Sequence, residues 1–364
     1  MSGESDPIRL RHLSIRDFRG IDRLELDFPE GDEERAGALV LAGDNGCGKT
    51  SVLEAILLLL GRVDLLPADT ASPRDLVRLG ARTFRIEGRF TGSGRAAETF
   101  VEAEHIEGLL SGLSSPSAAL PFGRAITRPV LSRTLVAMGW GGPLPEHYAV
   151  EFFSAHREPE GADGAVGQPS GGRSARDERR LHELARRLRN AAAHSGRQQV
   201  FEQIDRFVRP FLGDRWHLDV VFEHDAVGSE LLVVARDGEL PVGPRGPLNT
   251  MESLRAWATS GKSAPRVVPI DRLSSGQRSV LALCLPFVFG DRPIDLALID
   301  EPEEHFQPSW QRSLLGALRR LSPQTQLIVA THSPQVLDSV ASYERRALTA
   351  DGDWRTAPVA DAAE

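Results

Sequence analysis

A glycine-rich run that ends in a lysine and a hydroxyl residue is the clearest chemical feature of this sequence. It reads Gly-Asp-Asn-Gly-Cys-Gly-Lys-Thr from Gly43 to Thr50 and lies between an apolar strand-like segment and an apolar stretch over 51–60. Backbone N–H groups of such a loop and the positive end of the helix that follows it bind phosphate. We expect Lys49 to reach the outer phosphates and the Thr50 hydroxyl to bind Mg²⁺. The residues predicted to line the phosphates are Asn45, Gly46, Cys47, Gly48, Lys49, Thr50 and Ser51.

A serine-rich segment near the other end of the chain suits the same kind of ligand. It reads Leu-Ser-Ser-Gly-Gln and precedes an apolar helix predicted over 279–289. One interpretation is that Ser274 or Ser275 only caps that helix. The other is a second phosphate-binding helix end, which would act as a lid on the nucleotide of a partner subunit. The residues assigned to that contact are Ser274, Gly276 and Gln277.

Two predicted strands end in residues that can handle a metal ion and a water molecule. The first, over 294–299, is almost wholly apolar and is followed by Asp300 and Glu301. Open α/β sheets bind ligands at the carboxyl ends of their strands. We expect Asp300 to hold Mg²⁺ through water and Glu301 to orient and deprotonate the attacking water. The second strand, over 326–330, runs into His332, which could hydrogen-bond the γ-phosphate; the alternative is a structural histidine.

The four motifs, in this order and spacing, resemble the ABC-type ATPase head, and specifically its RecF/SMC/OLD-like branch. Segments 13–21 and 24–28 are similar to the amino-terminal hairpin of that branch, and Asp300 to Pro308 resembles its Walker B and D-loop pattern. The resemblance covers 1–105 and 265–340. It implies an α/β P-loop NTPase fold with a mixed sheet, ATP and Mg²⁺ as cofactors, and ATPase activity. It also implies a homodimer that sandwiches ATP, with Lys49, Thr50, Asp300, Glu301 and His332 from one copy and Ser274 and Gly276 from the other.

Two departures from the family pattern affect this expectation. Ser275 stands where the family commonly has glycine, a change that should still permit phosphate contact. The family also places a glutamine on Mg²⁺, whereas this chain has no glutamine before Gln168. Either another residue senses the metal or the ATPase is slow and weakly coupled. Arg78 and Arg157 are candidate substitutes, and the alternative is that both are surface arginines.

An insertion separates the two lobes of the predicted head. It contains a linker rich in Gly and Pro and two predicted helices, over 175–193 and 199–212, which we interpret as a helical arm. Paired strands are expected over 83–90 and 98–105. The predicted divisions are an amino-terminal lobe with the phosphate loop (1–105), the insertion (106–215), a carboxyl-terminal lobe with the signature, Walker B and histidine motifs (216–345), and a tail (346–364).

The arm carries the one basic cluster that the sequence shows. The segment from Arg173 to Arg197 contains eight arginines and only three acidic residues. Arg179, Arg180, Arg186 and Arg187 lie at the centre of this cluster. The cluster could follow the phosphates of DNA or RNA, or bind an acidic partner protein. The alternative is a solvated helix face. No aromatic residues are interleaved with these arginines, so base stacking is not supported.

Composition limits the remaining function classes. The chain has 364 residues, 26% of them charged, and a net charge of −8, which does not favour general nucleic-acid binding. No apolar run reaches the ~18–20 residues of a membrane span, and the first residues are polar. Two cysteines exclude a disulfide framework. We therefore expect a cytoplasmic protein without a membrane partner.

Three functions remain open. The favoured one is an ATP-gated dimeric switch that controls a separate effector, as in bacterial anti-phage defence. The alternative is a RecF-like repair or recombination ATPase that binds DNA directly. A transporter subunit is least expected, because the coupling glutamine is missing. An OLD-type nuclease would need a Toprim domain after the head, and because only 22 residues follow Ser342 we expect none here.

Overall fold

The structure is a computed structural model in which the chain divides into two compact units. The first unit comprises residues 1–167, 292–304 and 322–364, and the second comprises 168–291 and 305–321. The chain therefore passes between the units several times. The structure describes residues 8–31, 35–60, 62, 65, 76–92, 95–106, 109–115, 118–120, 148–153, 197–214, 216–224, 229–237, 242–243, 246–247, 250–259, 266–269, 272–290, 292–304 and 306–348.

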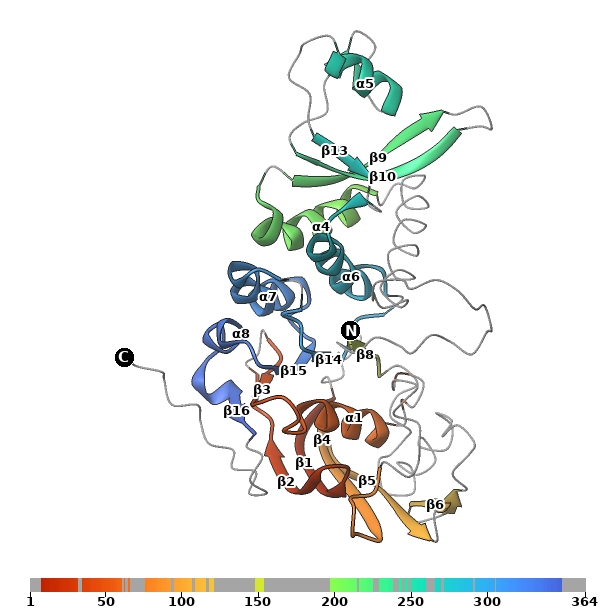
Figure 1. Cartoon of the computed structure of the whole chain (residues 1–364), viewed down its shortest axis with the longest axis vertical. Helices are drawn as coiled ribbons and strands as arrows, with labels where there is room; N and C mark the ends of the chain where they lie inside the picture. The colour runs from red at the N-terminus through yellow and green to blue at the C-terminus, as the bar shows by residue number, and fades with distance from the viewer. Residues whose placement is uncertain are drawn as a thin grey trace. The chain divides into compact units, whose positions relative to one another are not determined.

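A parallel sheet in the first unit carries three of the four predicted motifs at one edge (Figure 1). Its strand order is β16-β3-β15-β14-β8, and each neighbouring pair is parallel. The three central strands are buried along their whole length, as strands covered on both faces must be. The strands are β3 (Ala38–Ala42), β8 (Val150–Phe153), β14 (Leu296–Asp300), β15 (Gln326–Thr331) and β16 (Arg345–Ala347).

The register of this sheet brings distant motifs together. Asp300 at the end of β14 pairs with Ala330, and Thr331 at the end of β15 pairs with Ala42. The phosphate loop follows Ala42 directly. Because all these strands are parallel, their carboxyl ends share one edge of the sheet. The predicted strands over 294–299 and 326–330 are confirmed, each within two residues of its predicted bounds.

An antiparallel sheet forms the other half of the first unit, in the order β2-β1-β4-β5-β6-β7. Its first two strands form the expected amino-terminal hairpin, and β4 pairs with β5 as expected over 83–90 and 98–105. The last two strands lie in the predicted insertion, in a part of it for which no element was predicted. The bounds are β1 (Arg9–Phe18), β2 (Ile21–Asp27), β4 (Thr83–Gly92), β5 (Arg95–Ile106), β6 (Leu109–Ser115) and β7 (Ala118–Leu120).

Helix α1 (Lys49–Leu59) lies between the two sheets (Figure 1). It follows the phosphate loop, and every residue from Val52 to Leu59 is buried, as expected for a stretch that is apolar except at Glu54. Two hydrogen bonds also join the two sheets directly. The side chain of Gln326 on β15 accepts from the Leu10 N–H of β1 at 3.0 Å and donates to the Leu10 carbonyl at 2.8 Å. The phosphate loop is thus continuous with a helix that is buried between two linked sheets.

The turn of the β1–β2 hairpin is attached to this helix. Asp17 and Arg19 have positive φ values of 52° and 51°, which are uncommon for residues other than glycine. Backbone hydrogen bonds hold the turn, from the Arg19 N–H to the Leu76 carbonyl and from the Arg78 N–H to the Asp17 carbonyl, both at 2.8 Å. The Arg19 guanidinium then reaches the buried Glu54 of α1 at 2.6 Å. These contacts fix the hairpin relative to the helix that carries Lys49.

The second unit is built around three packed helices, α4 (Arg197–Leu212), α6 (Ser275–Phe289) and α7 (Pro308–Leu321). Phe211 of α4 lies 6.0 Å from Trp310 of α7 between ring centroids and 6.2 Å from Phe306. A sheet in the order β13-β10-β9 adjoins them. The remaining elements of this unit are β9 (Trp216–His224), β10 (Ser229–Asp237), β11 (Val242–Gly243), β12 (Gly246–Pro247), α5 (Met251–Thr259) and β13 (Arg266–Pro269).

Two helices had been predicted for the arm. The second, over 199–212, is confirmed as α4, whose apolar side faces α6 and α7. The first, over 175–193, lies outside the described residues, as do Arg179, Arg180, Arg186 and Arg187. None of the helices in the described ranges is long and apolar enough to cross a membrane.

Candidate nucleotide site at the carboxyl edge of the parallel sheet

The phosphate loop has a shape that its glycines make possible. Gly48 is the residue before α1 and has a φ of 97°, a left-handed conformation. Gly43 has a φ of 152°, and a Cβ at this position would collide with the Leu348 carbonyl and the Cys47 sulfur. Leu348 follows β16, and its N–H donates to the Ala42 carbonyl at 2.7 Å. The end of the parallel sheet therefore fixes the start of the loop.

The Lys49 side chain is folded into this loop. Its ammonium donates to the carbonyls of Gly43 at 2.7 Å and Asp44 at 3.0 Å, and the residue is only 5% exposed. Two backbone acceptors hold a compact cation at the mouth of the predicted phosphate site. Such a cation attracts phosphate oxygens strongly because little water screens it.

Thr50 and Asp300 meet although 250 residues separate them in sequence. The Thr50 hydroxyl lies 2.9 Å from Oδ2 and 3.1 Å from Oδ1 of Asp300. Among the described residues, no group of three or more His, Cys, Asp or Glu side chains converges as a metal site. A hydroxyl and a carboxylate nevertheless fit Mg²⁺, which takes few protein oxygens and completes its shell with water and phosphate.

Glu301 has an unusual backbone conformation directly after β14. Its φ is 45°, in the left-handed region, while its N–H still donates to the Ala330 carbonyl at 2.8 Å. A residue with a side chain in this region costs on the order of 1–2 kcal/mol. The strand therefore ends abruptly at this residue. The Glu301 side chain is 21% exposed, and its carboxylate lies 3.5 Å from Nδ1 of the His332 ring. Strain of this kind is often retained at functional positions.

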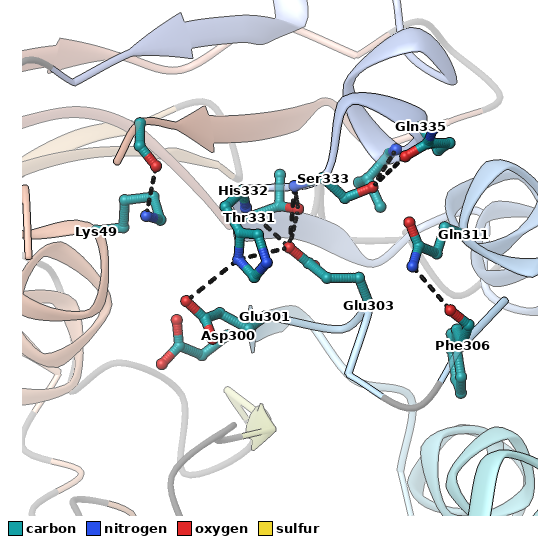
Figure 2. A network of polar contacts seen from close by, with 12 residues as sticks. Lys49, Asp300, Glu301, Glu303, Phe306, Gln311, Thr331, His332, Ser333 and Gln335 are labelled. Carbon is teal, nitrogen blue, oxygen red and sulfur yellow. Dashed lines mark hydrogen bonds and ion pairs between the residues drawn. The ribbon is translucent and has the colours of Figure 1, made fainter. Parts of the chain in front are cut away.

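His332 lies between two carboxylates (Figure 2). Its Nδ1 is 3.5 Å from Glu301 and 3.2 Å from Glu303, and the ring is half exposed at 49%. The structure thus brings together Lys49, Thr50, Asp300, Glu301 and His332 in one unit. Glu303 was not among the predicted site residues. The acidic run after Asp300 could have drawn attention to it, but nothing local distinguishes it from the exposed Glu304.

The serine-rich segment lies in the second unit, at the start of α6. Ser274 caps the helix by accepting from the Gln277 N–H at 3.3 Å, and the Gln277 side chain accepts from the Ser274 N–H at 3.0 Å. Ser274 is therefore an N-cap, and the helix begins at Ser275, four residues before its predicted start. Gly276 is buried. Contact of this segment with a nucleotide stays a prediction.

Arg78 and Arg157 are the two candidates to replace the missing glutamine. The Arg78 guanidinium lies 3.6 Å from the carboxylate of Asp22 on β2, so its contact belongs to the hairpin. Arg157 lies outside the described residues. Strand β8, which precedes it in the chain, pairs with β14 through Phe153 and Ile299.

Two family models match the chain. AAA_23, described as "AAA domain", matches residues 12–107, and AAA_21, described as "AAA domain, putative AbiEii toxin, Type IV TA system", matches residues 246–338. These two segments contain the phosphate loop and the other three motifs, respectively.

Curated relatives match shorter segments. The DNA replication and repair protein RecF of Anaeromyxobacter sp. (strain Fw109-5) is 39% identical over 26% of this chain and 23% of its own length. The "Retron Ec83 probable ATPase" of Escherichia coli is 34% identical over 20% and 15%. The Septu protein PtuA of Bacillus thuringiensis is 38% identical over 16% and 15%. The matched segments thus span less than a quarter of each of these relatives.

Solved structures with the same fold include SMC heads. The SMC head domain from Thermotoga maritima has a TM-score of 0.50 at 15% identity, covering 94% of this chain and 95% of that one. An SmcHead bound to the C-winged helix domain of ScpA has a TM-score of 0.51 at 16% identity, covering 91% and 92%. The predicted α/β P-loop fold is confirmed. Its motifs, its two family matches and this fold make the chain similar to ABC-type ATPase heads of the RecF/SMC-like branch.

Proposed function

We propose that the protein binds and hydrolyses ATP with Mg²⁺, and that ATP binding closes two copies into a dimer that switches a partner effector. Lys49 and the loop N–H groups of residues 45–51 would hold the phosphates. Thr50 and Asp300 would hold Mg²⁺, which, when bound, neutralises charge on the β- and γ-phosphates. Glu301 would accept a proton from the attacking water, and His332 would hydrogen-bond the γ-phosphate.

The contact between Thr50 and Asp300 carries this proposal. A hydroxyl from the start of α1 and a carboxylate from the end of β14 lie 2.9 Å apart, beside the only buried lysine in the described residues. Glu301 is the next residue and lies beside His332. The candidate phosphate-binding cation, the two candidate magnesium ligands and the candidate base all lie at one edge of the sheet, which supports a role in phosphoryl transfer to water.

The separation of the signature segment and the phosphate loop into two units supports the dimer proposal. The signature segment 274–277 and the phosphate loop belong to different units, and the Ser274 end of α6 offers backbone N–H groups at a helix start. Placing this helix end on the γ-phosphate of a second copy would complete two equivalent sites about a two-fold axis. Closure would then depend on ATP, and hydrolysis would release it.

Anti-phage defence is the role that we propose for the switch. The AAA_21 description, the retron ATPase and the Septu protein support it. The RecF relative supports a second candidate, a repair ATPase that binds DNA directly. The arginines between Arg173 and Arg197 are the proposed contact with an acidic partner protein in the first case and with nucleic acid in the second.

Duplex DNA distinguishes these two candidates. For the switch, we expect turnover of ATP by the wild-type chain to change less than twofold when DNA is added. Fluorescence anisotropy of a labelled duplex at physiological salt should show no binding that depends on ATP. A labelled duplex that binds only with ATP and Mg²⁺, and not to Lys49→Ala, would favour the repair candidate. A wild-type chain that does not turn over ATP under any of these conditions would contradict the ATPase proposal itself.

A further inference from the structure

The carboxylate of Glu303 is buried at the end of β15, although the residue comes from the segment that follows β14. Its side chain is only 4% exposed. One of its oxygens, Oε1, accepts from the Thr331 hydroxyl at 2.6 Å and from the backbone N–H groups of His332 at 2.8 Å and Ser333 at 3.1 Å. Hydrogen bonds to a charged acceptor are about twice as strong as neutral ones. Glu303 therefore fixes the path of the chain as it leaves the strand.

The same oxygen also faces the side chain of His332. The His332 Nδ1 lies 3.2 Å from it, so one carboxylate oxygen contacts both the backbone and the ring of this residue (Figure 2). An ionised carboxylate can only accept hydrogen bonds. A lone pair on Nδ1 would face this negative oxygen, so the tautomer with the hydrogen on Nδ1 is favoured, and Nε2 is left as the ring atom that can face a ligand. The tautomer of a functional histidine is often set in this way by the partner of one ring nitrogen.

Glu301 competes for the same ring hydrogen. Its Oε1 lies 3.5 Å from Nδ1, slightly farther than the oxygen of Glu303. If Nδ1–H donated to Glu301, a lone pair of the candidate base would be occupied and less able to accept a proton from water. The shorter contact with Glu303 draws the Nδ1–H away from Glu301, which leaves the carboxylate of Glu301 available for that role.

We propose that Glu303 is a positioning residue for the hydrolysis reaction. It sets the tautomer and orientation of His332, and it keeps the Nδ1–H of His332 away from Glu301. The inference rests on the proposed function for its effect on turnover. Its effect on the ring of His332 is independent of any nucleotide.

The Glu303→Gln variant tests this role. The amide oxygen of glutamine can still accept from Thr331, His332 and Ser333, so the fold should be retained, but the negative charge that attracts Nδ1–H is removed. We expect kcat for ATP to fall at least tenfold and KM to change less than twofold. Glu304→Gln makes the same chemical change at the next, exposed residue and should leave both values as in the wild type. Thermal melting shows whether each variant is folded.

Nitrogen NMR of the histidine rings supplies the second readout, without nucleotide and at a pH where the rings are neutral. The His332→Gln variant identifies the signals of His332 among those of the ten histidines. We expect the Nδ1–H tautomer in the wild type and in Glu304→Gln, and a smaller fraction of it in Glu303→Gln. An Nε2–H tautomer in the wild type would overturn the proposal. So would a Glu303→Gln protein with an unchanged tautomer, or one with wild-type kcat.

A wild-type chain without ATPase activity would contradict the proposed function, and in that case no kcat could be compared. The tautomer of His332 would still be measurable. Failure of the positioning role and failure of the proposed function are thus distinguished by separate readouts.

Discussion

Replacement of Lys49 by alanine is expected to abolish measurable ATP binding and to leave the fold intact. The ammonium is held by the Gly43 and Asp44 carbonyls at the mouth of the phosphate loop, where it would meet the phosphate charge. The shape of the loop does not depend on it, because the conformations of Gly43 and Gly48 and the contact with Leu348 set that shape. We expect affinity for a labelled ATP analogue to fall at least tenfold, about 1.4 kcal/mol.

Lys262→Ala is the matched control for this variant. The chain has only these two lysines, so both variants remove the same charge and the same side chain. The control should bind the analogue like the wild type in equilibrium titrations. If Lys49→Ala retained affinity within about threefold, or ~0.6 kcal/mol, the assignment of Lys49 to the phosphates would be wrong.

Replacement of Glu301 by glutamine is expected to slow ATP hydrolysis by roughly 10²–10⁴-fold while ATP still binds. Glutamine has nearly the same shape and can adopt the same backbone conformation, but it cannot accept a proton from water. Single-turnover measurements with saturating protein isolate this step from nucleotide exchange. Asp300→Asn should differ, since loss of the carboxylate beside Thr50 should weaken binding that depends on Mg²⁺. Wild-type turnover in Glu301→Gln would show that the base is another group.

The elements that flank the motifs could be predicted because their signals are local. Val40 and Leu41 precede a glycine-rich loop, and Leu296 to Ile299 precede two carboxylates, so an apolar run and its polar end lie side by side in sequence. Parallel strands then place those ends at one edge of a sheet. The meeting of Thr50 with Asp300 follows from these two facts, and it is observed.

Features that depend on tertiary contacts could not be predicted. Glu303 and Glu304 are the same residue type in adjacent positions, yet one is buried against Thr331 and the other is exposed. The sequence also contains no sign that Glu301 is left-handed, since that conformation is imposed where β14 leaves its pairing with β15. The partners of α4 were likewise unknown, because amphipathic spacing indicates a buried face but not what covers it.

The proposed switch depends on dimerisation driven by ATP, and Glu301→Gln is the variant in which to measure it. The γ-phosphate that would bridge the two copies is not removed there, so the closed state should accumulate. Multi-angle light scattering of this variant with ATP and Mg²⁺ should show the mass of a dimer, and without nucleotide that of a monomer. Adding Ser274→Arg should place a bulky side chain against the partner's phosphates and block closure while nucleotide binding persists. Adding Ser342→Arg, at an exposed position outside the motifs, should not. A Glu301→Gln protein that stays monomeric at saturating ATP, or a dimer that forms without nucleotide and is indifferent to Ser274→Arg, would contradict the account.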